Sequence, residues 1–272
     1  MRLAKRKNDG KRFLRVIVPT YNGGRRFDDT MYESILAQTF DDYHLVVVDD
    51  VSDDNTRAIL NRMKRIDKRI YLKEKRYAGG ARNAAYGTFA DDEYTLFLDD
   101  DDRLWDEHVF QRIHDCAVEN GMPDVIRMNW RNHCEGQHIQ KLGQVVPTLD
   151  TVEKICGDIT RHAPWNRVIK TEKLVEFPEG ITTDDGIQAI RQLDVCETAA
   201  VIPECCYEWK IRSGSITTSF RKPMQRYSHY IEFAELVRMS EFDAADGGCE
   251  HGWAREAARR RLKWLTEKSA RM

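Results

Sequence analysis

The sequence lacks the cysteine pattern of a disulfide framework. Its 272 residues include seven cysteines, which is an odd number, and no two of them form a Cys-x-x-Cys pair. Cysteine and histidine also do not fall at the spacing of a zinc finger, which argues against a structural zinc site. Unpaired cysteines are typical of the reducing cytosol. We therefore expect a cytoplasmic protein without disulfides.

Long apolar runs are also missing. No stretch approaches the roughly 18 apolar residues that a membrane-spanning helix needs. The basic start of the chain is not followed by the apolar core of a signal peptide. We expect neither a transmembrane segment nor a secretory leader, and the sequence contains no internal repeat.

A large net charge is absent, but the two signs are distributed unevenly. The formal net charge is -2. Residues 1–12 and 253–272 each carry a net charge of +5, which leaves -12 on residues 13–252. The basic ends predict peripheral contact with an anionic membrane or with nucleic acid. The ordinary alternative is a solvated charged face, because short charged tails are common in soluble proteins.

The first half of the chain alternates between strand and helix patterns. Apolar, β-branched runs predict strands at 15–19, 44–48, 70–72, 94–98 and 125–130. Helices are predicted after capping residues at 28–30 and 52–54, and at 79–85 and 107–119. This alternation predicts an α/β fold with a mainly parallel sheet flanked by helices.

The second half is less regular. Residues 133–165 have the composition of loop and edge strand. Residues 184–195 predict a helix, and residues 207–211 predict a strand. Two helices are expected to close the chain, one at about 223–240 and one from residue 253.

Polar segments directly follow three of the predicted strands. They are Pro19 to Asn22, Asp49 with Asp50, and the acidic run Asp99 to Asp102. Ligands of open parallel sheets bind beyond the carboxyl ends of the strands, so these segments are expected at one site.

Four adjacent carboxylates belong either on a solvated loop or around a cation. Hard cations take one or two carboxylates together with substrate phosphates, whereas the spacing of a calcium loop is missing.

Seven motifs in the sequence together carry a family resemblance. They are VIVPTYN (16–22), VVVDDVSDDNT (46–56), GGARNAA (79–85), LFLDDDD (96–102), WNRVIK (165–170), TTDDG (182–186) and YEWKIRSGSIT (207–217). In this order they resemble the family 2 glycosyltransferases of the GT-A fold.

The resemblance implies a domain organisation. A GT-A domain would span residues 13–219, with a donor half at about 13–130 and an acceptor half at about 131–219. A basic tail at 1–12 would precede the domain, and a helical extension at 220–272 would follow it.

The resemblance also implies a metal-dependent, inverting glycosyltransferase that uses a nucleotide diphosphate sugar, with a UDP-sugar as the favoured donor. The acidic run resembles the family's D-x-D element. By that match, Asp99 faces the ribose and diphosphate, with Asp100 nearby. Asp101 is then the most direct ligand of Mn²⁺ or Mg²⁺, and Asp99 is the second. The metal would neutralise charge on the departing diphosphate.

Five further residues match donor-binding positions of the family. Asp50 would hydrogen-bond the base, although it could instead cap the following helix. Tyr21 would stack on the base in a pocket shaped by Pro19 and Thr20, and the alternative is an ordinary turn. Arg82 would pair with the diphosphate, which suits a guanidinium, or with one of the acids in a surface ion pair.

Inversion requires a group that takes the proton of the attacking hydroxyl. The resemblance assigns this role to Asp185, with Asp184 orienting it or binding the acceptor. The alternative is that Thr183 or Asp184 caps a helix. Asp184 stands where glutamate is more usual, and Val51 stands where glycine is more usual, so the turn after Asp50 is expected to differ.

Four residues are candidates for the acceptor side and a closing loop. Trp165 and Asn166 would lie in the acceptor floor, where Trp165 could stack on a sugar or could equally belong to the core. Arg212 and Ser215 would fold over the diphosphate after the donor binds.

The acceptor itself is left open by the sequence. A saccharide hydroxyl is the first expectation. A hydroxymethylated base of viral DNA is the alternative that would use the basic ends. A nucleotide-sugar binding protein without turnover and a nucleotidyltransferase are the remaining alternatives.

Overall fold

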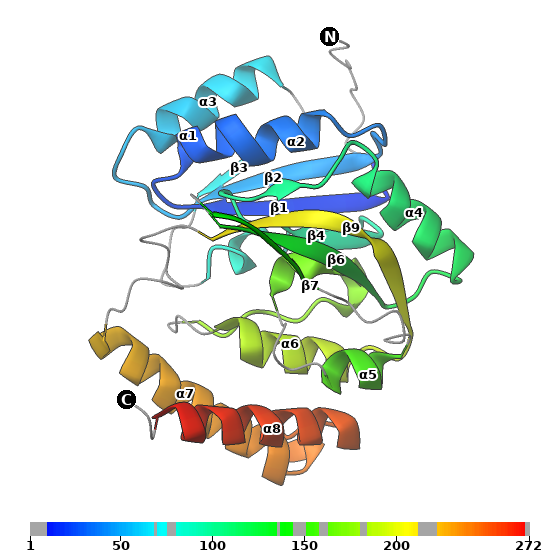
Figure 1. The fold of residues 1–272 in the computed structure, drawn as a ribbon, viewed down its shortest axis with the longest axis vertical. Coiled ribbons are helices and arrows are strands. Elements are labelled where there is room, and N and C mark those ends of the chain that lie inside the picture. The colour runs from blue at the N-terminus through cyan, green and yellow to red at the C-terminus, as the bar shows by residue number, and fades with distance from the viewer. Residues whose placement is uncertain are drawn as a thin grey trace.

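The computed structural model describes residues 10–67, 70–74, 80–134, 137–143, 151–157, 163–179, 184–211 and 222–269. Nine strands in these ranges form one sheet between two groups of helices (Figure 1). The strands are β1 (Leu14–Thr20), β2 (Tyr43–Asp49), β3 (Ile70–Glu74), β4 (Tyr94–Phe97), β5 (Arg103–Leu104), β6 (Val125–Cys134), β7 (Gln137–Gly143), β8 (Arg167–Lys170) and β9 (Ala199–Ile211). Their order is β3-β2-β1-β4-β8-β6-β9-β5, and β7 pairs with β6.

The first four strands form a parallel half of the sheet. β1 pairs with β2 and β4, and β2 pairs with β3, all in parallel. Every residue of β2 is buried, as expected for a strand with both faces covered. Parallel pairing brings the carboxyl ends of β1, β2 and β4 to one edge, where Thr20 lies in register with Asp49. This edge receives the acidic run that follows β4.

The rest of the sheet is mixed in direction, whereas the first four strands pair in parallel with one another, as predicted. β8 runs antiparallel to both β4 and β6. β9 runs parallel to β6 and antiparallel to β5. The apolar pattern of a single strand predicts its burial but carries no information about the direction of its neighbours.

Four helices cover one face of the sheet. They are α1 (Gly24–Arg26), which continues through a π-helical segment at Phe27–Tyr32 into α2 (Glu33–Leu36), together with α3 (Thr56–Ile66) and α4 (Val109–Glu119). The first helix begins at Gly24 and not at the predicted cap, so Asp28 lies inside it. The reason is tertiary: the Gly24 N–H donates to Thr56 Oγ1 at 2.9 Å, which gives this helix start a partner on α3.

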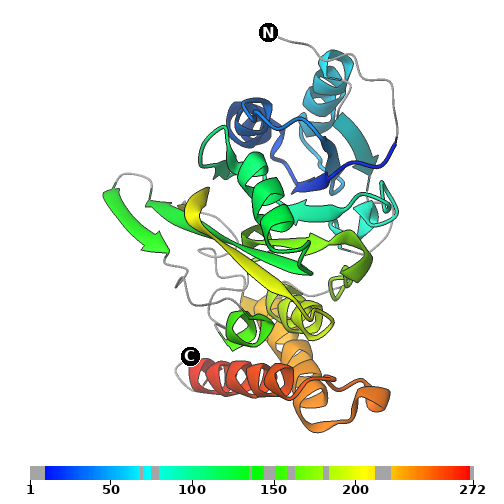
Figure 2. The ribbon, with the colours of Figure 1, turned by 90° about the vertical axis from the view of Figure 1, so that its right-hand side faces the viewer.

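The opposite face carries the remaining helices, and the last two form an outer pair (Figure 2). They are α5 (Val152–Gly157), α6 (Asp184–Asp194), α7 (Lys222–Glu241) and α8 (Gly252–Ser269). α6 and the closing pair confirm the predicted helices, whereas α5 falls in a segment predicted as loop and edge strand. The predicted helix at 79–85 is only a 3₁₀ turn at Asn83–Ala85. Across the described ranges, no helix is long and apolar enough to cross a membrane.

Val51, directly after β2, adopts a left-handed backbone conformation with φ of +59°. The backbone turn at this position thus has the conformation that glycine adopts without strain. For a β-branched residue this conformation is a genuine outlier. Val51 is 61% exposed, so little packing offsets the strain.

Replacing Val51 with glycine is therefore expected to stabilise the protein. Relief of the left-handed strain is expected to raise the free energy of unfolding by about 1–2 kcal/mol. The extra conformational freedom of glycine in the unfolded chain lowers it again by roughly 0.5–1 kcal/mol. The net gain can be measured by urea unfolding. Val51→Ala is the matched control, because it keeps the Cβ and should gain less. A glycine variant no more stable than the alanine variant would contradict the assignment of strain.

Candidate active site

Three of the four carboxylates of the acidic run contact different parts of the protein. The second, Asp100, turns back toward the loop after β1. Its Oδ2 accepts a hydrogen bond from Thr20 Oγ1 at 2.5 Å and lies 3.6 Å from Nη2 of Arg26. A Cβ on Gly23 would lie 1.9 Å from the same oxygen, so only glycine permits this approach. Asp100 thus holds the β1–α1 loop against the end of β4.

The fourth carboxylate, Asp102, is buried and turns toward β9. Its Oδ2 accepts a hydrogen bond from the Tyr207 hydroxyl at 2.7 Å, and its Oδ1 accepts from the Lys210 N–H at 2.7 Å. The Tyr207 oxygen also accepts from the Asp99 N–H at 3.2 Å. Tyr207 therefore fixes both the backbone and a side chain of the acidic run.

The first carboxylate, Asp99, is linked to the predicted base through one arginine. Arg82 Nη2 donates to Asp99 Oδ1 at 2.9 Å, while its Nη1 lies 3.9 Å from Asp185 Oδ1. The Asp99 and Asp185 side chains are partly exposed, at 33% and 47%, so a ligand can reach both. The structure thus brings together three residues that the sequence assigned separately to donor, diphosphate and base.

Three carboxylates of the acidic run, those of Asp99, Asp100 and Asp102, are held in an environment that raises their pKa values. Burial raises the pKa of Asp100 to about 6, against the lowering effect of Thr20 and Arg26. Burial, followed by the negative charge of Asp99, raises the pKa of Asp102 to about 8. The pKa of Asp99 is also raised, first by burial and then by Asp185 and Asp101, while Arg82 opposes the shift. Added positive charge would therefore be favourable here.

The predicted base-binding side is formed by two loops that contact each other. Asn22 donates its N–H to Ser52 Oγ at 3.0 Å, and its Oδ1 accepts from the Asp53 N–H at 3.0 Å. Tyr21 is 55% exposed beside these contacts, so its ring can receive another ring. The Asp50 N–H donates to the Thr20 carbonyl at 2.9 Å, which places Asp50 next to the same loop. The base-binding roles of Tyr21, Asp50, Pro19 and Thr20 stay predictions.

Helix capping by Asp50 is not what the structure shows. α3 begins at Thr56, and the Thr56 N–H donates to Asp54 Oδ1 at 2.8 Å. Asp54 was among the predicted capping residues. Asp50 is therefore not the cap of α3.

The predicted acceptor floor lies in the core. Trp165 is 5% exposed, and its ring stacks on the Tyr207 ring at 4.4 Å between centroids with planes 8° apart. Asn166 is 1% exposed. Of the two roles considered for Trp165, the structure supports core packing. Arg212 and Ser215 lie outside the described residues, as do Thr182 and Thr183, and of Asp184 only the backbone start of α6 is described.

No cluster of three or more histidine, cysteine, aspartate or glutamate side chains that could hold a metal ion occurs in the part of the chain that the structure describes. The predicted site needs fewer protein ligands, because diphosphate oxygens would complete the coordination. The donor chemistry fits a hard cation: Asp99 and Asp101 offer carboxylate oxygens, and each raises the cost of charging the other acids nearby.

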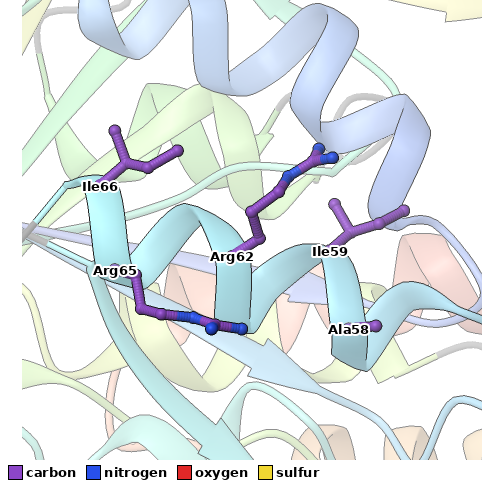
Figure 3. A pocket seen from close by; sticks show the side chains of 5 residues that line it. All are labelled: Ala58, Ile59, Arg62, Arg65 and Ile66. Carbon is purple, nitrogen blue, oxygen red and sulfur yellow. The ribbon is translucent and has the colours of Figure 1, made fainter.

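A hollow on α3 is unrelated to this chemistry. Its volume is about 470 Å³, and Figure 3 shows the side chains that line it. It is lined by Ala58, Ile59, Arg62, Arg65 and Ile66. None of these side chains carries a carboxylate, and the Arg62 guanidinium is already paired with Asp28 at 2.9 Å. The hollow on α3 is therefore not part of the candidate active site.

Sequence reasoning missed Tyr207, Gly23 and Arg26 as parts of this site. Tyr207 stands in one of the quoted motifs, but a single tyrosine gives no sign of a partner more than a hundred residues away. The consecutive glycines after Asn22 are a usable signal, because they indicate a backbone that another group approaches closely.

A parallel sheet half that gathers acids at the carboxyl ends of its strands is typical of open α/β proteins that bind a ligand at this edge. The family model described as glycosyl transferase family 2 matches residues 15–186. The chain belongs to this family and is a glycosyltransferase. It is 41% identical over 255 residues to the putative teichuronic acid biosynthesis glycosyltransferase TuaG of Bacillus subtilis, covering 93% of this chain and 98% of that protein.

Solved structures support the GT-A fold. S. aureus TarS in complex with UDP-GlcNAc superposes with a TM-score of 0.73 at 19% identity, covering 92% of this chain and 71% of that chain. The mannosyltransferase PcManGT of Pyrobaculum calidifontis, in complex with GDP-Man and Mn²⁺, gives a TM-score of 0.57 at 16% identity, covering 96% and 74%. At these identities the likeness concerns the fold alone.

Replacing Tyr207 with phenylalanine is expected to destabilise the protein by about 1–3 kcal/mol, because a buried carboxylate loses a donor and the Asp99 N–H loses an acceptor. Donor affinity should fall with it, since the acidic run loses support. Tyr94→Phe is the matched control: its buried hydroxyl donates to the Pro123 carbonyl at 2.8 Å, away from the acidic run. Urea unfolding and titration with UDP measure the two effects. Equal UDP affinity in both variants would count against a role for Tyr207 in the site.

Proposed function

We propose that the protein transfers a sugar from a UDP-sugar to a saccharide hydroxyl, with inversion at the anomeric carbon and with the help of a divalent cation. The acceptor hydroxyl oxygen would bond to the anomeric carbon as the bond from that carbon to the diphosphate breaks. Asp185 would take the hydroxyl proton, and UDP would leave with the bonding electron pair. This balance needs no oxidant, reductant or further reactant.

The observation that carries the proposal is the chain of contacts Asp99–Arg82–Asp185. It brings an acid from the donor half and an acid from the acceptor half to opposite ends of one guanidinium. An inverting displacement requires the base and the leaving group on opposite sides of one sugar, and hence close to each other. Arg82 could then exchange its carboxylate partners for diphosphate oxygens, which suit its planar donors.

Asp101 and Asp99 would hold the cation. When bound, Mn²⁺ or Mg²⁺ would act as a Lewis acid on the leaving diphosphate. PcManGT contains Mn²⁺ according to its description, which supports a metal in this fold. The chain's own part is to bring two carboxylates together at the end of β4 while Asp100 and Asp102 hold that loop in place.

The descriptions of similar proteins support the proposed classes of donor and acceptor. TarS is described with UDP-GlcNAc, and TuaG is described as acting in teichuronic acid biosynthesis. A saccharide acceptor fits the second description, and a UDP-sugar fits the first. A location in the cytoplasm is part of the proposal, because such donors are made there and the described cysteines are free.

The DNA alternative gains no support from α8 in the structure. It needs an open cationic surface on α8, but three arginines of this helix are already paired with glutamates. Arg261 pairs with Glu232, Arg259 with Glu241 and Arg260 with Glu256. We therefore retain the saccharide acceptor.

Asp185→Asn should abolish transfer and leave donor binding intact. Loss of a general base lowers turnover by roughly 10²–10⁴-fold. UDP release from a UDP-sugar in the presence of a saccharide acceptor measures turnover, and calorimetric titration with UDP and Mn²⁺ measures binding. Retained turnover would move the base elsewhere, whereas lost binding would mean that Asp185 supports the donor site.

Asp101→Asn should weaken the metal-dependent part of UDP affinity at least tenfold, or about 1.4 kcal/mol. The comparison is between titrations with Mn²⁺ and with EDTA. Asp91→Asn is the matched control, because Asp91 is an exposed acid that precedes β4 at its opposite end. Unchanged affinity of the Asp101 variant in Mn²⁺ would refute the metal assignment.

A further inference from the structure

A guanidinium from the C-terminal extension lies directly on the residue that follows the proposed base. A Cβ on Gly186 would be 3.3 Å from Cζ, Nε and Nη2 of Arg261 alike. Three equal distances mean that the guanidinium lies flat over this glycine. Gly186 belongs to the first turn of α6, and Asp185 precedes it in the same turn. Any larger residue at 186 would push the guanidinium away.

Arg261 is itself held on two other sides. Its Nε and Nη2 both lie 2.8 Å from Oε1 of Glu232 on α7, and Glu232 is fully buried. Its Cζ lies 4.4 Å from the centre of the Trp264 ring on α8, a cation–π contact. A buried carboxylate without its cation is costly, so Glu232 keeps Arg261 in place. The set of Glu232, Arg261 and Trp264 is here called the clamp.

The clamp lies beyond the part of the chain that matches the family model, which ends at residue 186. Two guanidinium groups of different origin therefore approach the helical turn that carries Asp185. Arg82 approaches its carboxylate from the donor half at 3.9 Å. Arg261 covers the adjoining backbone from the extension. The first restrains the side chain, and the second restrains the helical turn that carries it.

We propose that Arg261 is a positioning residue: through Gly186 it fixes the first turn of α6 and so aims Asp185 at the acceptor hydroxyl. This rests on the proposed function, in which Asp185 is the base. It gives the α7–α8 pair a role in turnover beyond covering the sheet. A small displacement of a general base can lower turnover on the order of a hundredfold, so a contact of this kind is sufficient.

Two substitutions separate positioning from stability. Arg261→Lys keeps a cation for Glu232 but loses the flat group that covers Gly186. Gly186→Ala adds a methyl group at 3.3 Å from that group, and alanine is the better helix former, so the helix itself is not weakened. Both variants should fold with near wild-type melting temperature and bind UDP with Mn²⁺ normally. Both should lower kcat on the order of tenfold, with the donor KM unchanged.

Arg260→Met is the matched control. Arg260 precedes Arg261 on α8 and pairs with Glu256 at 3.7 Å, with both side chains about half exposed. The Arg260→Met substitution removes one cation from the same helix without touching α6. It should leave kcat, KM and melting temperature unchanged. A control variant that loses as much kcat as Arg261→Lys would overturn the proposal, because the effect would then come from charge on α8.

The outcome is distinguishable from a failure of the proposed function. Wild-type kcat in both Arg261→Lys and Gly186→Ala, with turnover lost in Asp185→Asn, refutes positioning alone. Retained turnover in Asp185→Asn refutes the base and the positioning proposal with it. If kcat falls together with the melting temperature or the UDP affinity, the clamp acts only as a structural ion pair, and this result also refutes the proposal. Selective loss of kcat in both variants supports it.

Discussion

The arrangement of the active site depends on one constraint, which is that four adjacent carboxylates at the end of β4 cannot share one environment. Like charges in sequence must separate, and here they separate toward different segments. Asp100 goes to the loop after β1, Asp102 goes to β9, and Asp99 goes to Arg82. Each of these contacts holds one segment of the chain against the end of β4. The mutual repulsion of these carboxylates raises the free energy of the folded protein, and the contacts that relieve it bring the segments of the site together.

The second consequence is electrostatic. Burial and mutual repulsion raise the pKa values of Asp99, Asp100 and Asp102. Arg82 lowers that of Asp99 but also faces Asp185. One guanidinium cannot neutralise this set. A divalent cation and an anionic donor would enter together at low cost, because the cation offsets both the protein's acids and the diphosphate.

Much of the fold followed from the sequence, and the failures have identifiable physical causes. Most strands of the first half and the closing helices were predicted because burial leaves a periodic pattern. The start of α1 was misplaced because Gly24 is held by Thr56, a contact that local capping rules do not contain. For the candidate site, motifs singled out Asp99, Arg82 and Asp185, which the structure brings together and whose roles stay predictions. The burial of Trp165 against Tyr207 was not identified from motifs, because an aromatic ring suits a sugar and a core equally well.

The extension shows why a site cannot be read from its motif alone. A general base needs a direction as well as a chemical group, and direction comes from whatever holds its backbone. In the first turn of a helix the backbone N–H groups have no intrahelical partners, so this turn is less restrained than the middle of the helix. Packing against another element is then the available restraint. Gly186 accepts such packing because it has no side chain, and Arg261 supplies a rigid, flat group paired with a buried acid. Gly186, directly after the proposed base, is therefore better understood as a contact surface for Arg261 than as a flexible joint.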